Sequence, residues 1–257
     1  MPYRLAASAE MIFTDLPFVD RVKEISSRGF EVEIWDWTQK DLNALAATDA
    51  TFGSMTGYIT GDLLEDDGIE AFLSSAEKSI EASKIIDCPR LNVHGTGLDS
   101  NGQAIRKRYS TTEAEWDKAT ETLTRLAELG EKHNKMFMLE NLNLLVDHPG
   151  TPFGLAKDTI KLVSTINSPY LRLNLDLYHA QIGEGNLTEL VREAFDYIGE
   201  IQVADVPGRM EPGTGEINYR RVARELKTLN YNGVVGLEGW ASGDPVAALE
   251  AFAEAFA

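Results

Sequence analysis

Residues 200–219 read Glu-Ile-Gln-Val-Ala-Asp-Val-Pro-Gly-Arg-Met-Glu-Pro-Gly-Thr-Gly-Glu-Ile-Asn-Tyr. The apolar run 201–206 is typical of a short buried strand, and the Gly- and Pro-rich stretch after it is typical of a loop. The loop ends at Asn218, a residue type that favours a helix N-cap. A buried strand that opens into a polar, glycine-rich loop is typical of the functional end of an α/β barrel. Five polar or charged side chains crowd this junction: Gln202, Asp205, Arg209, Glu211 and Glu216.

The same order of an apolar strand followed by a helical pattern repeats along the chain. Strands are predicted at residues 4–9, 30–35, 51–56, 90–94, 135–140, 170–176, 201–206 and 233–238. Helices are predicted at residues 18–28, 41–47, 69–86, 110–129, 154–166, 187–198, 219–229 and 245–256. One of these helices is expected to start at the capping-box pattern 110–113 and to end at Gly130. Because parallel strands need crossover connections, this strict alternation predicts a parallel sheet.

Eight strand–helix units in 257 residues predict an α/β fold of the (β/α)8 TIM barrel type, with one domain over residues 1–257. An open doubly wound sheet is the alternative. Such a sheet usually carries a glycine-rich phosphate-binding turn after its first strand. Residues 7–10 read Ala-Ser-Ala-Glu, which is not such a turn, and no change of composition marks a linker between domains.

The formal net charge is −17, from 24 basic and 41 acidic residues. This charge argues against a nucleic acid partner, because phosphate binding needs a basic surface. It also gives no general attraction to anionic membranes, and no apolar run approaches membrane-spanning length. A small anionic substrate would need a local cation. The one cysteine, Cys88, permits no intrachain disulfide, which is in keeping with a cytoplasmic location.

Four consecutive predicted strands carry a polar side chain at or near their C-terminal end: Glu140, Asp176, Gln202 and Glu238. Taken singly, each of these residues has a structural alternative. A Glu at a strand end can be a salt-bridge partner, Asp176 can cap a helix, and Gln202 can be a hydrogen-bonded core amide. Burying several carboxylates together is costly unless a cation neutralises them. Oxygen ligands select a hard divalent ion such as Mg²⁺ or Mn²⁺. The repetition therefore predicts one divalent metal site formed by all four side chains.

Two further side chains follow the ends of these strands. His179 is interpreted as a contact to a substrate hydroxyl or carbonyl, and the alternative is an exposed loop histidine. Arg209 follows the dipeptide Pro207-Gly208, which would hold its side chain near the barrel mouth. Its planar guanidinium suits a substrate carboxylate, and the alternative is a solvated loop arginine.

The predicted strand 90–94 and the end of the strand 30–35 supply more candidates for the barrel mouth. Asn92 and His94 are expected to bind substrate. Trp35 and Trp37 are expected to form an aromatic wall or to pack in an interface, so a homo-oligomer is compatible with the sequence. The expected partner is a small molecule, a hydroxy-oxo acid or a small sugar.

The segment 204–219 strongly resembles the hydroxypyruvate isomerases, which belong to the xylose-isomerase-like barrels together with ketose 3-epimerases and inosose dehydratases. The resemblance extends to residues 13–18, 176–181 and 236–238, and so spans most of the chain. It implies that Glu140 and Glu238 are the two proton-transfer glutamates and that Asp176 and Gln202 complete the metal site. The implied reaction interconverts hydroxypyruvate and tartronate semialdehyde by metal-assisted proton transfer through an enediolate.

Four positions near the expected pocket depart from the family pattern. Asn141 stands where the family usually has Pro, and Asn92 where it frequently has His. Residues 34–37 and 239–240 also differ from the usual motifs. Because these changes lie near the expected pocket, they bear on the identity of the substrate more than on the type of reaction. A ketose 3-epimerase or another small-sugar isomerase using the same site remains the alternative, and a non-catalytic sugar-binding barrel is a further one.

Overall fold

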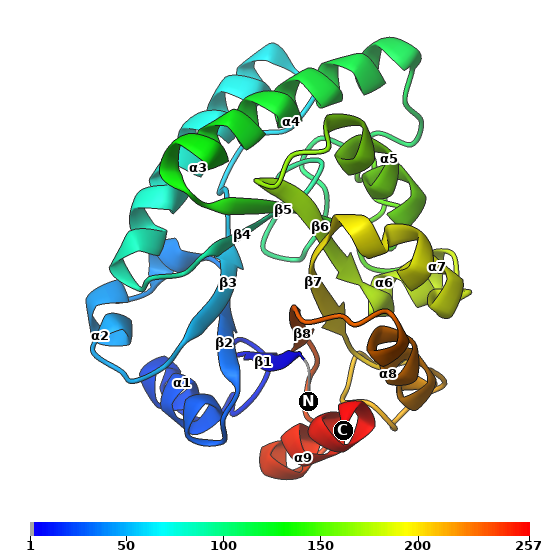
Figure 1. The fold of residues 1–257 in the computed structure, drawn as a ribbon. Coiled ribbons are helices and arrows are strands. Elements are labelled where there is room, and N and C mark those ends of the chain that lie inside the picture. Colours follow the sequence, from blue (N-terminus) through cyan, green and yellow to red (C-terminus); the bar gives the residue numbers. More distant parts are fainter. Residues whose placement is uncertain (1–2) are drawn as a thin grey trace.

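Eight parallel strands pair in sequence order from β1 to β8, and β8 pairs back onto β1 to close the barrel (Figure 1). The computed structural model describes residues 3–257; Met1 and Pro2, the first residues of the predicted domain, lie outside it. The strands are β1 (Arg4–Ser8), β2 (Glu31–Ile34), β3 (Phe52–Thr56), β4 (Arg90–Val93), β5 (Met136–Glu140), β6 (Leu171–Asp176), β7 (Ile198–Val203) and β8 (Val234–Leu237). The predicted TIM barrel is therefore confirmed.

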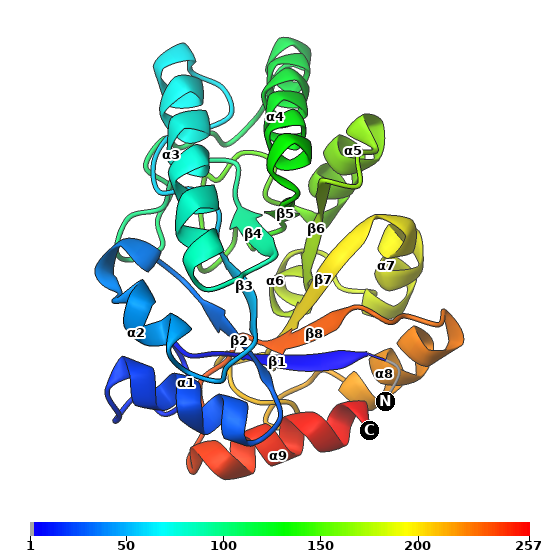
Figure 2. The ribbon, with the colours of Figure 1, turned by 60° about the vertical axis from the view of Figure 1, so that its left-hand side comes forward.

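Helices connect the strands and form an outer layer around them, as Figures 1 and 2 show from two directions. They are α1 (Phe18–Ser27), α2 (Leu42–Ala46), α3 (Asp66–Ile85), α4 (Glu113–His133), α5 (Ala156–Ile166), α6 (Leu177–Gly183), α7 (Leu187–Ala194), α8 (Tyr219–Thr228) and α9 (Pro245–Phe256). Two short 3₁₀ helices, η1 (Trp37–Gln39) and η2 (Phe195–Tyr197), lie in the connections. Within the described part of the chain, no helix combines the length and apolarity needed to cross a membrane.

The side chains of each strand alternate between the helical layer and the barrel interior. On β6, Leu173 and Leu175 belong to the hydrophobic core. Asn174 lies between them and hydrogen-bonds across the interior to Asn92 of β4 and Gln202 of β7. The barrel interior is therefore partly polar. Asp176, two residues after Asn174, is the last residue of β6.

The prediction that one helix ends at Gly130 is wrong, because α4 continues past it to His133 and is capped by Asn134, whose φ of 52° is left-handed. A Cβ on Gly130 would lie 2.6 Å from the backbone oxygen of Lys135. Gly130 thus permits a close approach between α4 and the start of β5 rather than ending the helix. The capping box at the helix start is formed by Thr112 and Glu115, slightly later than predicted.

Two boundaries near the strand ends also differ from the prediction. β7 covers residues 198–203 rather than 201–206, so the loop after it starts earlier. Helix α6 follows Asp176 at once, where a loop was expected, because the Asp176 carboxylate accepts a hydrogen bond from the backbone N–H of His179 at 2.9 Å. This cap fixes the carboxylate of Asp176 and the first turn of α6 relative to each other.

Candidate active site

The predicted polar side chains meet at the C-terminal ends of the strands. Glu140 and Asp176 are the last residues of β5 and β6, and Glu238 directly follows β8. The strand register pairs Asp176 with Gln202 and Gln202 with Gly236. The side chains of Glu140, Asp176, Gln202 and Glu238 are all buried. This end of the strands is the functional face of TIM barrels.

Glu140, Asp176 and His179 form a buried group that can hold a metal ion, because one potential ligand atom of each lies within 4.8 Å of the others. His179 Nε2 lies 3.8 Å from Glu140 Oε1 and 3.9 Å from Asp176 Oδ2. Asp176 Oδ2 is buried and has no hydrogen-bond partner among residues 3–257. Burial and the charge of Glu140 raise the pKa of Asp176 well above its ordinary value. A bound cation would supply the missing counter-charge.

The carboxylate of Glu140 is in contact with Asn92 of β4 and with His94, the residue that follows β4. Asn92 Nδ2 donates to Glu140 Oε2, and His94 Nε2 lies 2.9 Å from the same oxygen. Burial raises the pKa of Glu140, but the contacts with His94 and Asn92 and the charge of Arg209 bring it below its ordinary value. Asn92 and His94 therefore lie at the site, in contact with Glu140, and their role as substrate contacts stays a prediction.

The carboxylate of Glu238 is held by two donors. Trp35 Nε1 donates to Glu238 Oε1 at 2.7 Å, and Arg209 Nη2 donates to Glu238 Oε2 at 2.5 Å. Burial raises the pKa of Glu238, and Arg209 and Trp35 offset this only in part. The sequence placed Trp35 in a wall or an interface but gave no sign that its indole N–H holds this carboxylate. Trp37 instead donates to Ser79 Oγ at 3.0 Å, on α3.

The side chain of Arg209 lies beside His179 and Tyr178 at the C-terminal ends of the strands. Its Nη2 is 3.4 Å from His179 Nε2, and its guanidinium carbon is 4.9 Å from the centre of the Tyr178 ring. The three carboxylates of Glu140, Asp176 and Glu238 outnumber this single guanidinium, and burial keeps the pKa of His179 well below its ordinary value. With the three carboxylates ionised, the site carries an excess of two negative charges, which a divalent cation would balance.

The side chain of Gln202 is hydrogen-bonded to two other polar side chains of the strands. Its Oε1 accepts a hydrogen bond from Asn174 Nδ2 at 2.6 Å, and its Nε2 donates to Glu33 Oε2 at 2.9 Å. The amide oxygen keeps a second lone pair, so its predicted role as a metal ligand stays open. Burial and the charge of Glu200 raise the pKa of Glu33 well above its ordinary value. The sequence gave no signal for this buried acid, which contacts Gln202.

Asn141, which stands where the family usually has Pro, joins two of the strand ends. Its Nδ2 donates to the backbone oxygen of Asp176 at 2.9 Å, and its Oδ1 accepts from the backbone N–H of Asp176 at 3.0 Å. This pair of hydrogen bonds fixes the separation between Glu140 and Asp176, which a proline at position 141 would not do.

The loop after β7 is organised by Asp205, which is fully buried. Its carboxylate accepts hydrogen bonds from the backbone N–H groups of Val206, Gly213 and Ile217 at 2.8–3.0 Å. Its backbone oxygen accepts from the N–H of Arg209 at 3.0 Å. Asp205 therefore holds the loop in the shape that directs Arg209 to the site. Its role in the structure is to position the loop.

Replacing Asp205 by Ala should lower the free energy of unfolding by about 2–3 kcal/mol, because hydrogen bonds to a carboxylate are worth about 1.5–3 kcal/mol each and water reaches part of the loop. For a chain of this size the thermal midpoint should fall by about 5–10 °C. Thermal unfolding followed by circular dichroism measures this. The control is Glu216→Ala in the same loop, an exposed residue that contacts Gln181 at 3.1 Å. Equal midpoints for the two variants would contradict the role given to Asp205.

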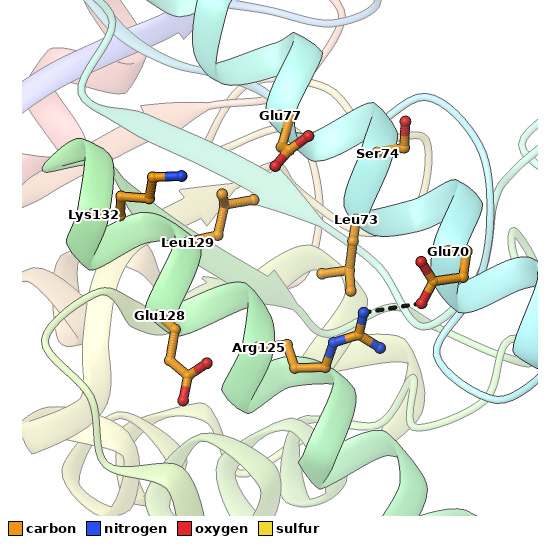
Figure 3. Close-up of a pocket in the computed structure, with 8 residues that line it drawn as sticks. All are labelled: Glu70, Leu73, Ser74, Glu77, Arg125, Glu128, Leu129 and Lys132. Atoms are coloured by element: carbon orange, nitrogen blue, oxygen red, sulfur yellow. Dashed lines mark hydrogen bonds and ion pairs between the residues drawn. The ribbon is translucent and has the colours of Figure 1, made fainter.

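A groove lies on the outside of the barrel, between α3 and α4 (Figure 3). Its volume is about 410 Å³, and it is lined by Glu70, Leu73, Ser74, Glu77, Arg125, Glu128, Leu129 and Lys132. Every lining side chain is exposed or half-buried, and Arg125 Nη2 is paired with Glu70 Oε1 at 2.9 Å. This groove lacks the buried, mutually perturbed carboxylates found at the strand ends, which remain the candidate active site.

Comparison with known proteins agrees with this geometry. The family model described as "Xylose isomerase-like TIM barrel" matches residues 19–256. The 2-oxo-tetronate isomerase of Pectobacterium atrosepticum is 31% identical over 247 residues, which cover 91% of this chain and 91% of that protein. The hydroxypyruvate isomerase of Escherichia coli (strain K12) is 27% identical over 247 residues, which cover 91% of this chain and 92% of that protein.

The solved structure of an AP endonuclease, family 2, from Brucella melitensis has a TM-score of 0.86 to this chain. The sequence identity is 24%, and the match covers 98% of each chain, so this similarity concerns the fold. The family model and the sequence relatives confirm the resemblance that the segment 204–219 indicated. The chain belongs to the xylose isomerase-like TIM barrel family and is an isomerase.

Proposed function

We propose that this isomerase interconverts hydroxypyruvate and tartronate semialdehyde. The observation that carries the proposal is the Arg209 guanidinium, which lies against Glu238 and His179 at the end of the barrel where the carboxylates meet. A planar guanidinium recognises a carboxylate with two parallel hydrogen bonds. The names of the two sequence relatives, hydroxypyruvate isomerase and 2-oxo-tetronate isomerase, both denote substrates with a carboxylate next to a carbonyl. A free ketose would leave Arg209 without such a partner.

The reaction moves a proton between adjacent carbon atoms through an enediolate. Glu140 and Glu238 come from β5 and β8, which are three strands apart in the ring, so they approach a substrate from well-separated directions. One Glu, in its ionised form, removes a proton from carbon, and the other, in its protonated form, gives a proton to the neighbouring carbon, while the proton of the substrate hydroxyl moves to the former carbonyl oxygen. The first Glu then releases its proton to solvent and the second takes one up. Arg209 would exchange its hydrogen bond with Glu238 for the substrate carboxylate, which frees the Glu238 oxygen for the reacting carbon.

We further propose that Glu140, Asp176, Gln202 and Glu238 hold a Mg²⁺ or Mn²⁺ ion. The unpartnered Asp176 Oδ2 and the burial of three carboxyl groups close to a single guanidinium support this donor set. Carboxylate and amide oxygens are the ligands that such hard ions prefer. When bound, the ion would stabilise the negative charge that develops on the substrate oxygens. The residues themselves supply the orientation of the substrate and the proton transfer.

Turnover of hydroxypyruvate by the purified protein, with Mg²⁺ or Mn²⁺ and after removal of metal with a chelator, tests the proposed function. We expect metal-dependent turnover of hydroxypyruvate that exceeds turnover of a panel of free ketoses. Epimerisation of a ketose at C3 without turnover of hydroxypyruvate would instead indicate the ketose 3-epimerase alternative. Binding of a sugar without turnover and without metal binding would indicate a non-catalytic barrel.

Replacing Arg209 by Lys should lower kcat/KM for hydroxypyruvate by about 10-fold or more, equivalent to about 1.4 kcal/mol. Lys keeps the charge but loses the two-pronged geometry of the guanidinium. Because the lost contact is to the carboxylate, turnover of any slowly converted ketose should change less than turnover of hydroxypyruvate. Steady-state kinetics on both substrate classes measures this difference, and an unchanged value for hydroxypyruvate would show that Arg209 does not bind its carboxylate.

The remaining expectations from the sequence are kept as proposals. We infer that the whole chain, residues 1–257, forms one barrel domain that acts in the cytoplasm. A homo-oligomer stays a prediction, which a measurement of the molar mass in solution would test.

A further inference from the structure

We propose that Asn143 fixes His179 as the neutral tautomer with its proton on Nε2. In this form His179 is a hydrogen-bond donor to a substrate oxygen and does not ligate the metal. Asn143 is then a positioning residue, since it acts through His179. The substrate part of this inference rests on the proposed function, whereas the tautomer rests only on the hydrogen bonds around the ring.

The orientation of the Asn143 amide is set by the backbone. Asn143 Oδ1 accepts hydrogen bonds from the backbone N–H groups of Val146 and Asp147 at 3.0 and 2.9 Å. An amide nitrogen cannot accept these bonds, so the oxygen must face this turn. The Nδ2 group consequently faces the other way, where it donates to Asp147 Oδ2 at 2.6 Å and lies 2.8 Å from His179 Nδ1. Both Asn143 and His179 are buried.

A donor that faces Nδ1 requires a lone pair on that nitrogen. A neutral imidazole carries one N–H, so the proton of His179 is on Nε2. Arg209 Nη2 also points to Nε2, but at 3.4 Å this contact is much weaker than the 2.8 Å contact at Nδ1.

The Nε2–H group faces the centre of the site. Glu140 Oε1 and Asp176 Oδ2 lie 3.8 and 3.9 Å from Nε2, which is too far for a direct hydrogen bond. A substrate hydroxyl or carbonyl oxygen between these groups would receive the hydrogen bond. A ring nitrogen that carries a proton has no lone pair for a metal ion. In this tautomer His179 is therefore not a metal ligand, in contrast to the carboxylates with which it shares the site.

The position of the proton can be measured by two-bond ¹H–¹⁵N NMR of the histidine rings, with the enzyme loaded with diamagnetic Mg²⁺. The chain contains four histidines, so the spectrum is simple, and the His179 signals are those missing from the His179→Gln variant. We expect the wild-type protein to carry the His179 proton on Nε2. A proton on Nδ1, or on both nitrogens, would overturn the inference.

Exchanging the two neighbouring side chains tests the positioning role. In the double variant Asn143→Asp/Asp147→Asn, the total charge is unchanged, and the new carboxylate at position 143 still accepts from the backbone of residues 146 and 147. Its second oxygen faces His179 Nδ1 as an acceptor, which should move the proton to Nδ1. The matched control Asp147→Asn keeps the Asn143 amide, so its proton should stay on Nε2.

We expect the double variant to lose about 10- to 100-fold in kcat relative to the Asp147→Asn control, with a smaller change in KM. This loss is typical of one hydrogen bond to an oxygen on which charge develops. A moved proton with unchanged kcat would show that His179 does not donate in the reaction. Should the double variant fail to fold, Asn143→Ala serves in its place, because Asp147 Oδ2, 3.8 Å from Nδ1, becomes the nearest acceptor.

These measurements separate the two proposals. If the wild-type protein does not turn over hydroxypyruvate, the proposed function fails, while the NMR spectrum still shows which ring nitrogen carries the proton. If turnover is present and the proton is on Nδ1, the role of Asn143 fails and the proposed function stands.

Discussion

Replacing Glu140 or Glu238 by Gln should each lower kcat for hydroxypyruvate by about 10²–10⁴-fold, the contribution of a positioned general acid or base. Gln has nearly the shape of Glu but cannot accept a proton at neutral pH. At position 140 the amide oxygen can still accept from Asn92 Nδ2, and at position 238 from Trp35 Nε1, whereas the contact between Arg209 Nη2 and position 238 is lost because an amide nitrogen cannot accept it. The loss should therefore reflect the missing carboxylate. Steady-state kinetics at saturating Mn²⁺ measures it.

The lost charge also weakens the predicted metal site, so the two roles of each Glu have to be separated. Isomerisation in D₂O, with metal occupancy measured on the same samples, reports proton exchange at the substrate carbon directly. A Gln variant that stays loaded with metal and exchanges substrate hydrogen at the native rate would show that this Glu is a ligand and not the proton carrier. Glu216→Gln is the matched control, because this exposed carboxylate lies in a neighbouring loop, and its kcat should equal that of the wild-type protein.

Replacing Asp176 by Asn should abolish most of the divalent ion binding, with an affinity for Mn²⁺ at least about 100-fold weaker. Asp176 Oδ1 caps helix α6 by accepting from His179 N–H, and Asn is an equally good N-cap, so the fold should be retained. What changes is the charge on Oδ2, the buried oxygen without a hydrogen-bond partner among residues 3–257. The variant thus removes a ligand charge and little else. Titration calorimetry with Mn²⁺ measures the affinity.

Thermal unfolding gives a second readout of the same change. A ligand at 100 times its Kd stabilises a protein by about 2.7 kcal/mol, so Mn²⁺ should raise the midpoint of the wild-type protein and leave the Asp176→Asn variant nearly unchanged. Without metal, the variant should be at least as stable as the wild-type protein at neutral pH, because burial raises the pKa of Asp176 well above its ordinary value and folding then has to bury the charge or take up a proton. Equal Mn²⁺ affinities for the two proteins would show that Asp176 is not a ligand.

The sequence was sufficient for the features that depend on local chain chemistry. Alternating strand and helix patterns determined the barrel, since apolar periodicity and turn residues act over a few neighbours. Carboxylates at the ends of β5 and β6 could be identified as a cluster because the strands of a parallel barrel end on the same face. Boundaries were less certain where tertiary contacts decide them, as at Gly130, which permits a close approach of two backbones instead of ending α4.

Only the tertiary structure decided which side chains hold the carboxylates and in which orientation. Trp35 and Glu238 are 203 residues apart in the chain, and they meet because β8 closes the barrel onto β1, whose other neighbour is β2. The orientation of His179 depends on Asn143, which lies in the loop after β5. No local pattern records such contacts, because hydrogen bonds between distant segments are set by strand register and ring closure. The sequence by itself thus determined the fold and the chemical groups of the site, and the closed barrel determined how these groups are paired.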